Sequence, residues 1–268
     1  MVQMLLGKIP IKVAQEETYE KEVLVLNEIG GFSRYTVDKD GVCKPIEFDF
    51  TGSFDEITSI GNYGLYYAFH SCTGITGSIN FPNLTSVNTN GLYRTFYGCT
   101  GINSVSFPKL TSIGNYGLYE TFHSCTGITG SINFPNLDSI GDSGLYYAFA
   151  ECTGINSVSF PELTSIGDDG LYNAFAGCTG IDSVSFPKLT SINNYGLSAA
   201  FAECTGITGS INFPKLTSVG DNGLNYAFYG CTGITELHFR ADAQSVIEAQ
   251  NTYSDKFGAT NATIHFDL

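Results

Sequence analysis

Seven of the eight cysteines recur in register, each opening a Cys-Thr-Gly tripeptide. Such thiols could bind a metal or form disulfides, but no spacing is the Cys-x-x-Cys of a zinc site, and seven is an odd number. Each shares a predicted inward face with leucine and phenylalanine, and unpaired cysteine is among the most buried residue types. We therefore predict a ladder of core thiols, with Cys43 outside it. The ladder consists of Cys72, Cys99, Cys125, Cys152, Cys178, Cys204 and Cys231.

Two histidines, His70 and His123, occupy the same position two repeats apart, which is about 10 Å by strand spacing. Two zinc ligands must each lie within about 2.1 Å of one ion. The pair therefore cannot share a metal, and we expect two solvated side chains. We predict no metal site and no cofactor.

Asp168-Asp169 and the pair Glu151 and Glu203 are the repeated acidic features. Paired carboxylates can bind calcium or act as acid and base in glycoside hydrolysis. Other repeats carry Asn, Ser, Thr or Gly at these positions, which suits turn chemistry better than catalysis. The chain also lacks Gly-x-Ser-x-Gly, His-Glu-x-x-His, a phosphate loop and a dinucleotide fingerprint. We expect no catalytic residues and no enzymatic activity.

The charge balance excludes other classes of partner. The formal net charge is -14, from 12 Lys and Arg against 26 Asp and Glu. Without a basic patch we expect no nucleic-acid binding, and an anionic lipid surface would repel the chain. No stretch approaches the roughly 18 apolar residues that cross a bilayer, and neither a secretory signal nor an anchor is visible. We expect a soluble chain with no direct membrane insertion.

The tripeptides mark an internal repeat, with steps of 27, 26, 27, 26, 26 and 27 residues. The extra residue always falls at one place, because the longer repeats contain Ile-Thr-Gly-Ser-Ile-Asn-Phe-Pro and the shorter ones Ile-Asn-Ser-Val-Ser-Phe-Pro. An insertion confined to one point predicts a bulge or loop beside a strand.

One segment of each repeat has helical periodicity. In residues 117–128, Leu118, Phe122 and Cys125 fall at i, i+4 and i+7, which predicts a helix of about two turns with one inward face. Asn115 and its counterparts are Asx residues that can cap free N–H groups or make a turn.

A strand follows each predicted helix. Gly127 suits a left-handed residue after the helix. Residues 105–107, Val-Ser-Phe, then alternate as a strand does, and Pro108 ends it. Leu110 and Ile113 supply a second inward pair on the way back.

These units predict an α/β repeat solenoid: a right-handed, leucine-rich-repeat-like stack of coils with a parallel sheet on one face and short helices on the other. Residues 1–50 are predicted to form a β-rich cap or attachment module, with a hairpin turn at 38–41. Residues 51–239 form about seven coils. Residues 240–268 form a helix and strand cap, in which Asp242 caps a helix through Gln250 and residues 262–266 add a strand.

The repeat resembles a known family. The motif is Ala148-Phe149-x-x-Cys152-x-x-Ile155-x-x-Val158-x-Phe160-Pro161-x-Leu163-Thr164-Ser165-Ile166-Gly167. It resembles the BspA-type leucine-rich repeat of bacterial, protist and phage-associated proteins, over residues 54–239. Family members are mostly surface proteins that adhere to host or matrix proteins or to other cells. The resemblance therefore implies an extracellular or cell-surface location.

Two faces are candidates for binding, and the sequence leaves the choice open. On the predicted helix face the outward columns vary most and are rich in tyrosine, which buries a large area at low entropic cost. A solvated face with scattered aromatics is the alternative. The helix-face candidates are Tyr67, His70, Tyr97, His123, Tyr147, Tyr226 and Tyr229. The sheet-face candidates, a strip of small polar residues, are Asn80, Ser106, Asn133, Ser159, Ser185 and Asn212.

Taken together, we expect a non-enzymatic repeat protein that recognises a protein or glycan on a cell surface. The alternative is a phage or prophage tail-associated structural or receptor-binding protein, located in the virion. In that alternative residues 1–50 attach to the particle, and the N-terminal segment is a candidate for homo-oligomer formation.

Overall fold

The computed structural model describes residues 21–26, 32–37, 43–45, 54 and 57–268. The strands expected in the N-terminal segment are present as β1 (Lys21–Leu26), β2 (Phe32–Val37) and β3 (Cys43–Pro45). They form an antiparallel sheet in the order β1-β2-β3. The predicted hairpin turn at 38–41 lies outside the described residues, and the role of residues 1–50 stays a prediction.

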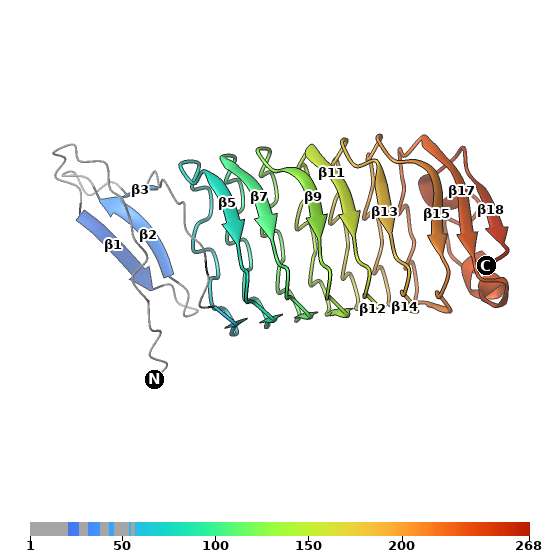
Figure 1. The fold of residues 1–268 in the computed structure, drawn as a ribbon, viewed down its shortest axis with the longest axis horizontal. Helices are drawn as coiled ribbons and strands as arrows, with labels where there is room; N and C mark the ends of the chain where they lie inside the picture. Colours follow the sequence, from blue (N-terminus) through green and yellow to red (C-terminus); the bar gives the residue numbers. More distant parts are fainter. Residues whose placement is uncertain (1–20, 27–31, 38–42, 46–53, 55–56) are drawn as a thin grey trace.

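From residue 57 the chain winds into a β-solenoid of about eight turns, the last of which is formed by the predicted C-terminal cap. One side carries the longer strands, side by side along the long axis of the molecule (Figure 1). All their pairings are parallel. These strands are β5 (Gly77–Asn80), β7 (Ile102–Ser106), β9 (Thr129–Asn133), β11 (Gly154–Ser159), β13 (Ser183–Ser185), β15 (Thr208–Phe213), β17 (Gly233–Phe239) and β18 (Thr263–Phe266).

A second side carries a seven-stranded parallel sheet of two-residue strands. Each strand is a Ser-Ile or Ser-Val pair, and its β-branched residue faces the core with the serine outside. The strands are β4 (Ser59–Ile60), β6 (Ser86–Val87), β8 (Ser112–Ile113), β10 (Ser139–Ile140), β12 (Ser165–Ile166), β14 (Ser191–Ile192) and β16 (Ser218–Val219).

The third side, predicted as a row of short helices, contains consecutive turns instead, so the α/β description is wrong. A helix would bond each N–H to the carbonyl four residues earlier. Here alternate N–H groups leave the coil: Leu118 N donates to Gly144 O of the next coil at 2.8 Å. The N–H groups between them bond three residues back, as Tyr119 N does to Tyr116 O at 3.3 Å. We call this side the turn face.

The helical periodicity has a different origin on the turn face. Every fourth residue is left-handed, with φ of 55° at Tyr116, 46° at Glu120 and 57° at Ser124. A backbone that repeats every four residues places Leu118 and Phe122 inward together, both fully buried. The i, i+4 spacing therefore identified the core residues correctly and the backbone wrongly.

Gly127 is not the left-handed residue that was predicted, since that conformation belongs to the residue before each cysteine, such as Ser124. A Cβ on Gly127 would lie 2.3 Å from Thr100 O and 2.7 Å from Ile102 O. From Gly101 onward, the glycine of each Cys-Thr-Gly is thus required by close contact with the preceding coil.

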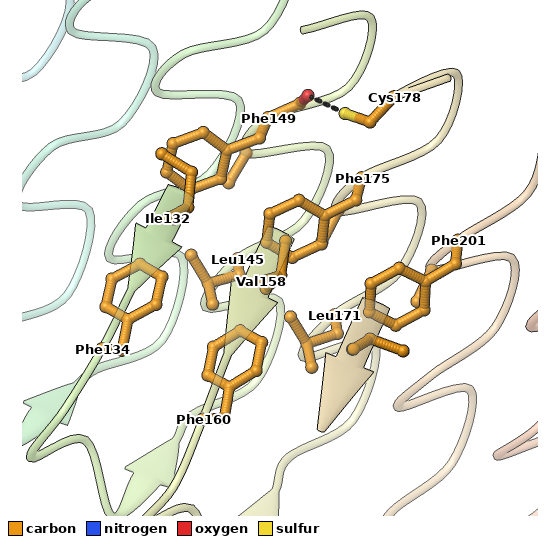
Figure 2. Close-up of a cluster of buried hydrophobic side chains, with 14 of the residues drawn as sticks. Ile132, Phe134, Leu145, Phe149, Val158, Phe160, Leu171, Phe175, Cys178 and Phe201 are labelled. Carbon is orange, nitrogen blue, oxygen red and sulfur yellow. Dashed lines mark hydrogen bonds between the residues drawn. The ribbon is translucent and has the colours of Figure 1, made fainter. Parts of the chain in front are cut away.

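The core is filled by two ladders of phenylalanine, one below the longer strands and one below the turn face (Figure 2). Neighbouring rings of the first ladder are stacked at 4.3–5.8 Å and those of the second at 5.2–6.0 Å. The ladders meet edge to face, as Phe160 and Phe175 do at 6.3 Å. Stacking identical residues at equivalent positions makes one continuous core.

The predicted thiol ladder is confirmed for its seven members, which are free and buried. Each thiol from Cys99 onward donates to a phenylalanine carbonyl of the preceding coil, as Cys178 Sγ does to Phe149 O at 3.1 Å (Figure 2). The cysteine column is therefore part of the packing between coils.

The predicted bulge is also confirmed. The strand register shifts between Gly77 and Ser78 and between Gly209 and Ser210. The glycine is left-handed at these points, with φ of 83° at Gly77 and 76° at Gly209, and the residue left unpaired lies opposite it on the neighbouring strand, at Asn103 and Thr235.

The C-terminal end contains the short elements η1 (Ala241–Ala243), α1 (Gln244–Glu248) and η2 (Lys256–Gly258), followed by β18. Asp242 does not cap a helix as predicted, because its carboxylate accepts a hydrogen bond from Arg240 Nε at 2.7 Å. In the described part of the chain, no helix has the length and apolar character to cross a membrane.

Candidate binding surface

Five tyrosines form a ladder along the turn face. Tyr93 lies between Tyr66 and Tyr119, with ring centroids 4.9 and 4.5 Å away and the latter pair within 2° of parallel. The ladder continues at 4.7 and 4.9 Å. All five side chains are half-buried, and each has the same position in successive coils. The members are Tyr66, Tyr93, Tyr119, Tyr146 and Tyr172.

A second, shorter ladder runs beside the first. His70, Tyr97 and His123 stack at 4.9 Å and 4.9 Å. Tyr67 joins the two ladders at one end, 4.7 Å from Tyr66 and 5.2 Å from His70. Tyr147 joins them at the other end, 4.9 Å from Tyr146 and 5.9 Å from His123. We call these ten side chains, together with Arg94 between them, the aromatic platform.

Arg94 is held inside the aromatic platform by its neighbours. Its Nη1 donates to Tyr67 Oη and its Nη2 to Glu120 Oε1, both at 2.9 Å. Its guanidinium carbon lies 5.7 Å from the ring centroids of Tyr93 and Tyr97, within cation–π range. Glu120 is 8% exposed, so this ion pair links two coils at a site that is partly buried from solvent.

Apart from Arg94 and its partner Glu120, the aromatic platform contains only tyrosine and histidine side chains. Burial raises the pKa of Tyr66 and Tyr93, and it raises the pKa of Tyr146 to about 12. Burial and the nearby Arg94 lower the pKa of His70. Since Arg94 and Glu120 offset one another, the platform is a neutral patch on a chain with a net charge of -14.

The structure divides the predicted outward residues into two groups. Tyr67, His70, Tyr97, His123 and Tyr147 are members of the aromatic platform. The other two lie at the C-terminal end, paired with each other at 5.9 Å. These are Tyr226 and Tyr229, 44% and 52% exposed.

Between the two groups the equivalent positions carry the small residues Asn173, Ala176, Ala199 and Ala202. The sequence-based site omitted the ladder from Tyr66 to Tyr172 and the Arg94–Glu120 pair. Their recurrence at one position was the available signal.

Ring stacking decides what the aromatic platform presents to solvent. Within a ladder each inner ring has both faces covered by its neighbours, as Tyr93 has. Ring edges and hydroxyl groups remain for contacts with a partner. Edges and hydroxyls suit the mixed apolar and hydrogen-bonding contacts of protein interfaces.

The sheet-face strip lies along the outer side of the longer strands, where Asn133, Ser185 and Asn212 are exposed. The other three predicted members, Asn80, Ser106 and Ser159, are half-buried. The serines that precede the strip bond to each other, as Ser104 Oγ does to Ser78 Oγ at 2.6 Å and Ser157 Oγ to Ser131 Oγ at 2.7 Å. The strip contains no aromatic anchor.

The repeated Asx residues connect coils and do not cap helices. Asp168 N donates to Asp142 Oδ1 at 3.1 Å, and Asn194 N donates to Asp168 Oδ1 at 3.1 Å. Glu151, the other acidic candidate, accepts a hydrogen bond from Ser124 Oγ at 2.7 Å. Contacts between coils of this kind account for Asp168 and Glu151 among the acidic residues that the sequence singled out.

One group of side chains that the sequence analysis missed could hold a metal. Glu236, His238 and His265 have ligand atoms within 4.8 Å of one another. Among the described residues, this is the one group of three or more such side chains that lies close enough to share a metal ion. Two signals were available: Glu236 and His238 replace the small polar residues of earlier coils, and His265 lies in the predicted last strand.

Comparison with models of known protein families identifies the type of repeat. A family model described as BspA type Leucine rich repeat region matches six copies, over residues 53–169 and 119–256. A search of the curated proteins returned no match.

Among solved structures, a leucine-rich repeat protein from Bacteroides ovatus ATCC 8483 is 17% identical, with a TM-score of 0.40 over 95% of this chain and 76% of that chain. A leucine rich cell surface protein from Faecalibacterium prausnitzii A2-165 is 12% identical, with a TM-score of 0.25 over 94% and 95%. The pneumococcal vaccine antigen PcpA is 12% identical, with a TM-score of 0.34 over 87% and 82%. These TM-scores are too low for any residue role to be transferred.

Proposed function

Because the chain belongs to the BspA-type leucine-rich repeat family, we propose that it is a non-enzymatic recognition protein that binds a partner protein on a cell surface through the aromatic platform. The observation that carries the proposal is the set of ten rings in mutual contact over five adjacent coils, eight of them in the two stacked ladders. Large half-buried aromatic side chains grouped in this way are the usual anchors of protein interfaces.

A protein partner fits this surface better than a glycan does. Sugars pack against the open face of an aromatic ring, and the inner rings of both ladders have their faces covered by neighbours. A protein can instead contact ring edges and bond to the tyrosine hydroxyl groups. The neutral character of the platform also avoids the repulsion that a net charge of -14 imposes elsewhere.

The proposal is tested by binding of the fluorescently labelled full chain to a panel of epithelial and bacterial cells. The double variant Tyr67→Ala/Tyr147→Ala removes the two rings that join the ladders. We expect it to lose binding by at least about tenfold, since aromatic anchors contribute about 2 kcal/mol or more each.

Tyr195→Ala is the matched control. Tyr195 is 41% exposed and left-handed, with φ of 53°, as Tyr147 is with φ of 49°. This variant should bind as the unaltered chain does. If the double variant binds as strongly as the unaltered chain, the aromatic platform is not the binding site. The exposed residues Asn133, Ser185 and Asn212 of the sheet face would then be the next candidates.

Treatment of the cells separates the two classes of ligand. Mild proteolysis of the cell surface should abolish binding, and periodate oxidation of glycans should leave it unchanged. The reverse result would support a glycan ligand and overturn the protein partner. A cell-surface location for this chain is part of the same proposal and is tested by fractionation of the source cells.

A phage or prophage tail component is the second candidate. It rests on the antiparallel sheet β1-β2-β3, which does not follow the repeat and is a candidate attachment module. Light scattering of the full chain and of a form without residues 1–50 tests it. A full chain that is trimeric or larger beside a monomeric truncated form would favour this candidate, and two monomers would remove it.

A further inference from the structure

The outer side of the longer strands changes its chemistry in the last two turns. In β15 and the equivalent earlier strands, the two outward positions are serine followed by serine or asparagine. In β17 the same two positions carry Glu236 and His238, in register with Ser210 and Asn212. The next strand, β18, places His265 directly beside His238. Three residues that can bind metals thus replace neutral residues at one place.

The four polar side chains at this place are already oriented toward one another. His238 Nδ1 lies 2.8 Å from Asp267 Oδ1, and His238 Nε2 lies 3.2 Å from Glu236 Oε2. The rings of His238 and His265 stack at 4.6 Å and 14°. One ligand atom from each of Glu236, His238 and His265 lies within 4.8 Å of the other two.

Asp267 fixes the tautomer of His238. An ionised carboxylate only accepts hydrogen bonds, so Nδ1 of His238 must carry the proton that it donates to Asp267. In neutral His238 the lone pair of Nε2 then faces the carboxylate of Glu236. Either a second proton on Nε2 or a metal ion in its place satisfies both atoms, and the second option reproduces the carboxylate–histidine–metal order common in metal sites.

We propose that Glu236, His238 and His265 bind one divalent transition-metal ion of the zinc class, with Asp267 orienting His238 and water completing the coordination. Imidazole with one carboxylate suits zinc, nickel and copper, whereas calcium requires six to eight oxygen ligands. Ligands at about 2.1 Å in a tetrahedral site lie about 3.4 Å apart. The 3.2 Å separation of His238 Nε2 and Glu236 Oε2 is close to this value.

His265 completes the site by a small movement. It lies on β18, which among the described strands pairs only with β17, and its side chain is half-buried. Among the described residues, no second strand pairs with the other edge of β18 to hold its side chains in place. A bound ion would link β17 to β18 and so fasten the last turn of the solenoid.

The test is calorimetric titration of zinc chloride into the full chain, produced without a histidine tag and kept reduced. We expect one equivalent of zinc to bind and calcium chloride to give no heat. His238→Ala and His265→Ala should each abolish stoichiometric binding. Asp267→Asn, which removes only the orienting carboxylate, should weaken binding by about 10-fold to 100-fold.

The other two histidines supply the matched control, because the sequence contains four in all. The double variant His70→Ala/His123→Ala should bind zinc as the unaltered chain does. Absence of stoichiometric binding to the unaltered chain overturns the proposal, as does full binding by the double variant His238→Ala/His265→Ala.

A second measurement needs no variant and does not depend on the fate of the aromatic platform. In proton–nitrogen spectra of the unaltered chain, substoichiometric zinc should shift the imidazole signals of two of the four histidines. Signals that do not move, or that all move together, would contradict the assignment.

Discussion

Arg94 and Glu120, from adjacent coils, form an ion pair at 2.9 Å in the middle of the aromatic platform. Their side chains are 32% and 11% exposed, so the carboxylate is the more buried partner. The hydrogen bond to Glu120 raises the pKa of Arg94. The equivalent column elsewhere contains Tyr, Asn and Ala, which shows that the solenoid does not need a charge at this position.

This arrangement predicts unequal effects of removing the two partners. Arg94→Ala leaves a mostly buried carboxylate unpaired and should lower the free energy of unfolding by about 1–3 kcal/mol. Arg94→Ala/Glu120→Ala should recover most of that loss. Urea unfolding of the single and double variants measures both values, and a double variant no more stable than Arg94→Ala would contradict the explanation.

The left-handed residues of the turn face predict a stabilising glycine substitution. Ala199 has φ of 50°, a conformation that costs an L-residue about 1–2 kcal/mol. Ala199→Gly removes this strain and loses about 0.4–1 kcal/mol through the entropy of the unfolded chain. We expect an unchanged or slightly raised midpoint of thermal unfolding.

Ala202 is the control for this substitution, because it lies on the same face and is not among the residues with positive φ. Ala202→Gly should lower the free energy of unfolding by about 0.5–1 kcal/mol. If both variants lose stability equally, the turn face does not have the backbone described above.

The contact between Gly127 and the preceding coil predicts a strong effect of one methyl group. Gly127→Ala would place a Cβ 2.3 Å from Thr100 O, and the coils would have to separate. We expect a loss of about 1–3 kcal/mol. Gly61→Ala, which has nothing within 4 Å of its Cβ, should be neutral in the same unfolding assay. Comparable losses at the two glycines would count against the close contact.

Burial of the thiol ladder predicts both reactivity and pH dependence. Burial raises the pKa of Cys125 and Cys178 to about 12. In a Cys43→Ser background, a thiol reagent at pH 8 should leave the native chain unmodified and should label seven thiols after unfolding in urea. Rapid labelling of the native chain would show that the coils are not packed as described.

The same burial fixes the sign of the pH effect on stability. Above pH 9 the unfolded chain loses thiol protons that the folded chain keeps, so the free energy of unfolding falls as the pH rises toward 12. Each buried thiol contributes about 1.4 kcal/mol per pH unit. Cys178→Ala should show a shallower decline than the unaltered chain in urea unfolding between pH 9 and 11. Parallel declines would mean that Cys178 ionises normally in the folded state.

The inward positions could be predicted because they repeat. Leu118, Phe122 and Cys125 were assigned to the core from spacing alone, and all three are fully buried. The helix was wrong because a four-residue turn produces the same spacing, and the hydrogen bonds that distinguish it connect residues 26 positions apart, as from Leu118 N to Gly144 O.

For the candidate binding surface too, the sequence identified some of the residues, and the structure was needed to show how they are arranged. Tyr67 and Tyr147 were selected from the sequence because their column varies and faces outward. That their rings join two ladders required the distances between coils. The site at Glu236, His238 and His265 depends on the register of β17 against β18, and local sequence does not encode it.

The sequence by itself determined the repeat length, the core columns and the stacking of coils, because a short coil buries its apolar residues only against copies of itself. The tertiary structure decided the backbone of the turn face and the groups of side chains that meet across coils. Hydrogen bonds and ring contacts between residues 26 or 27 positions apart form only after the coils have stacked.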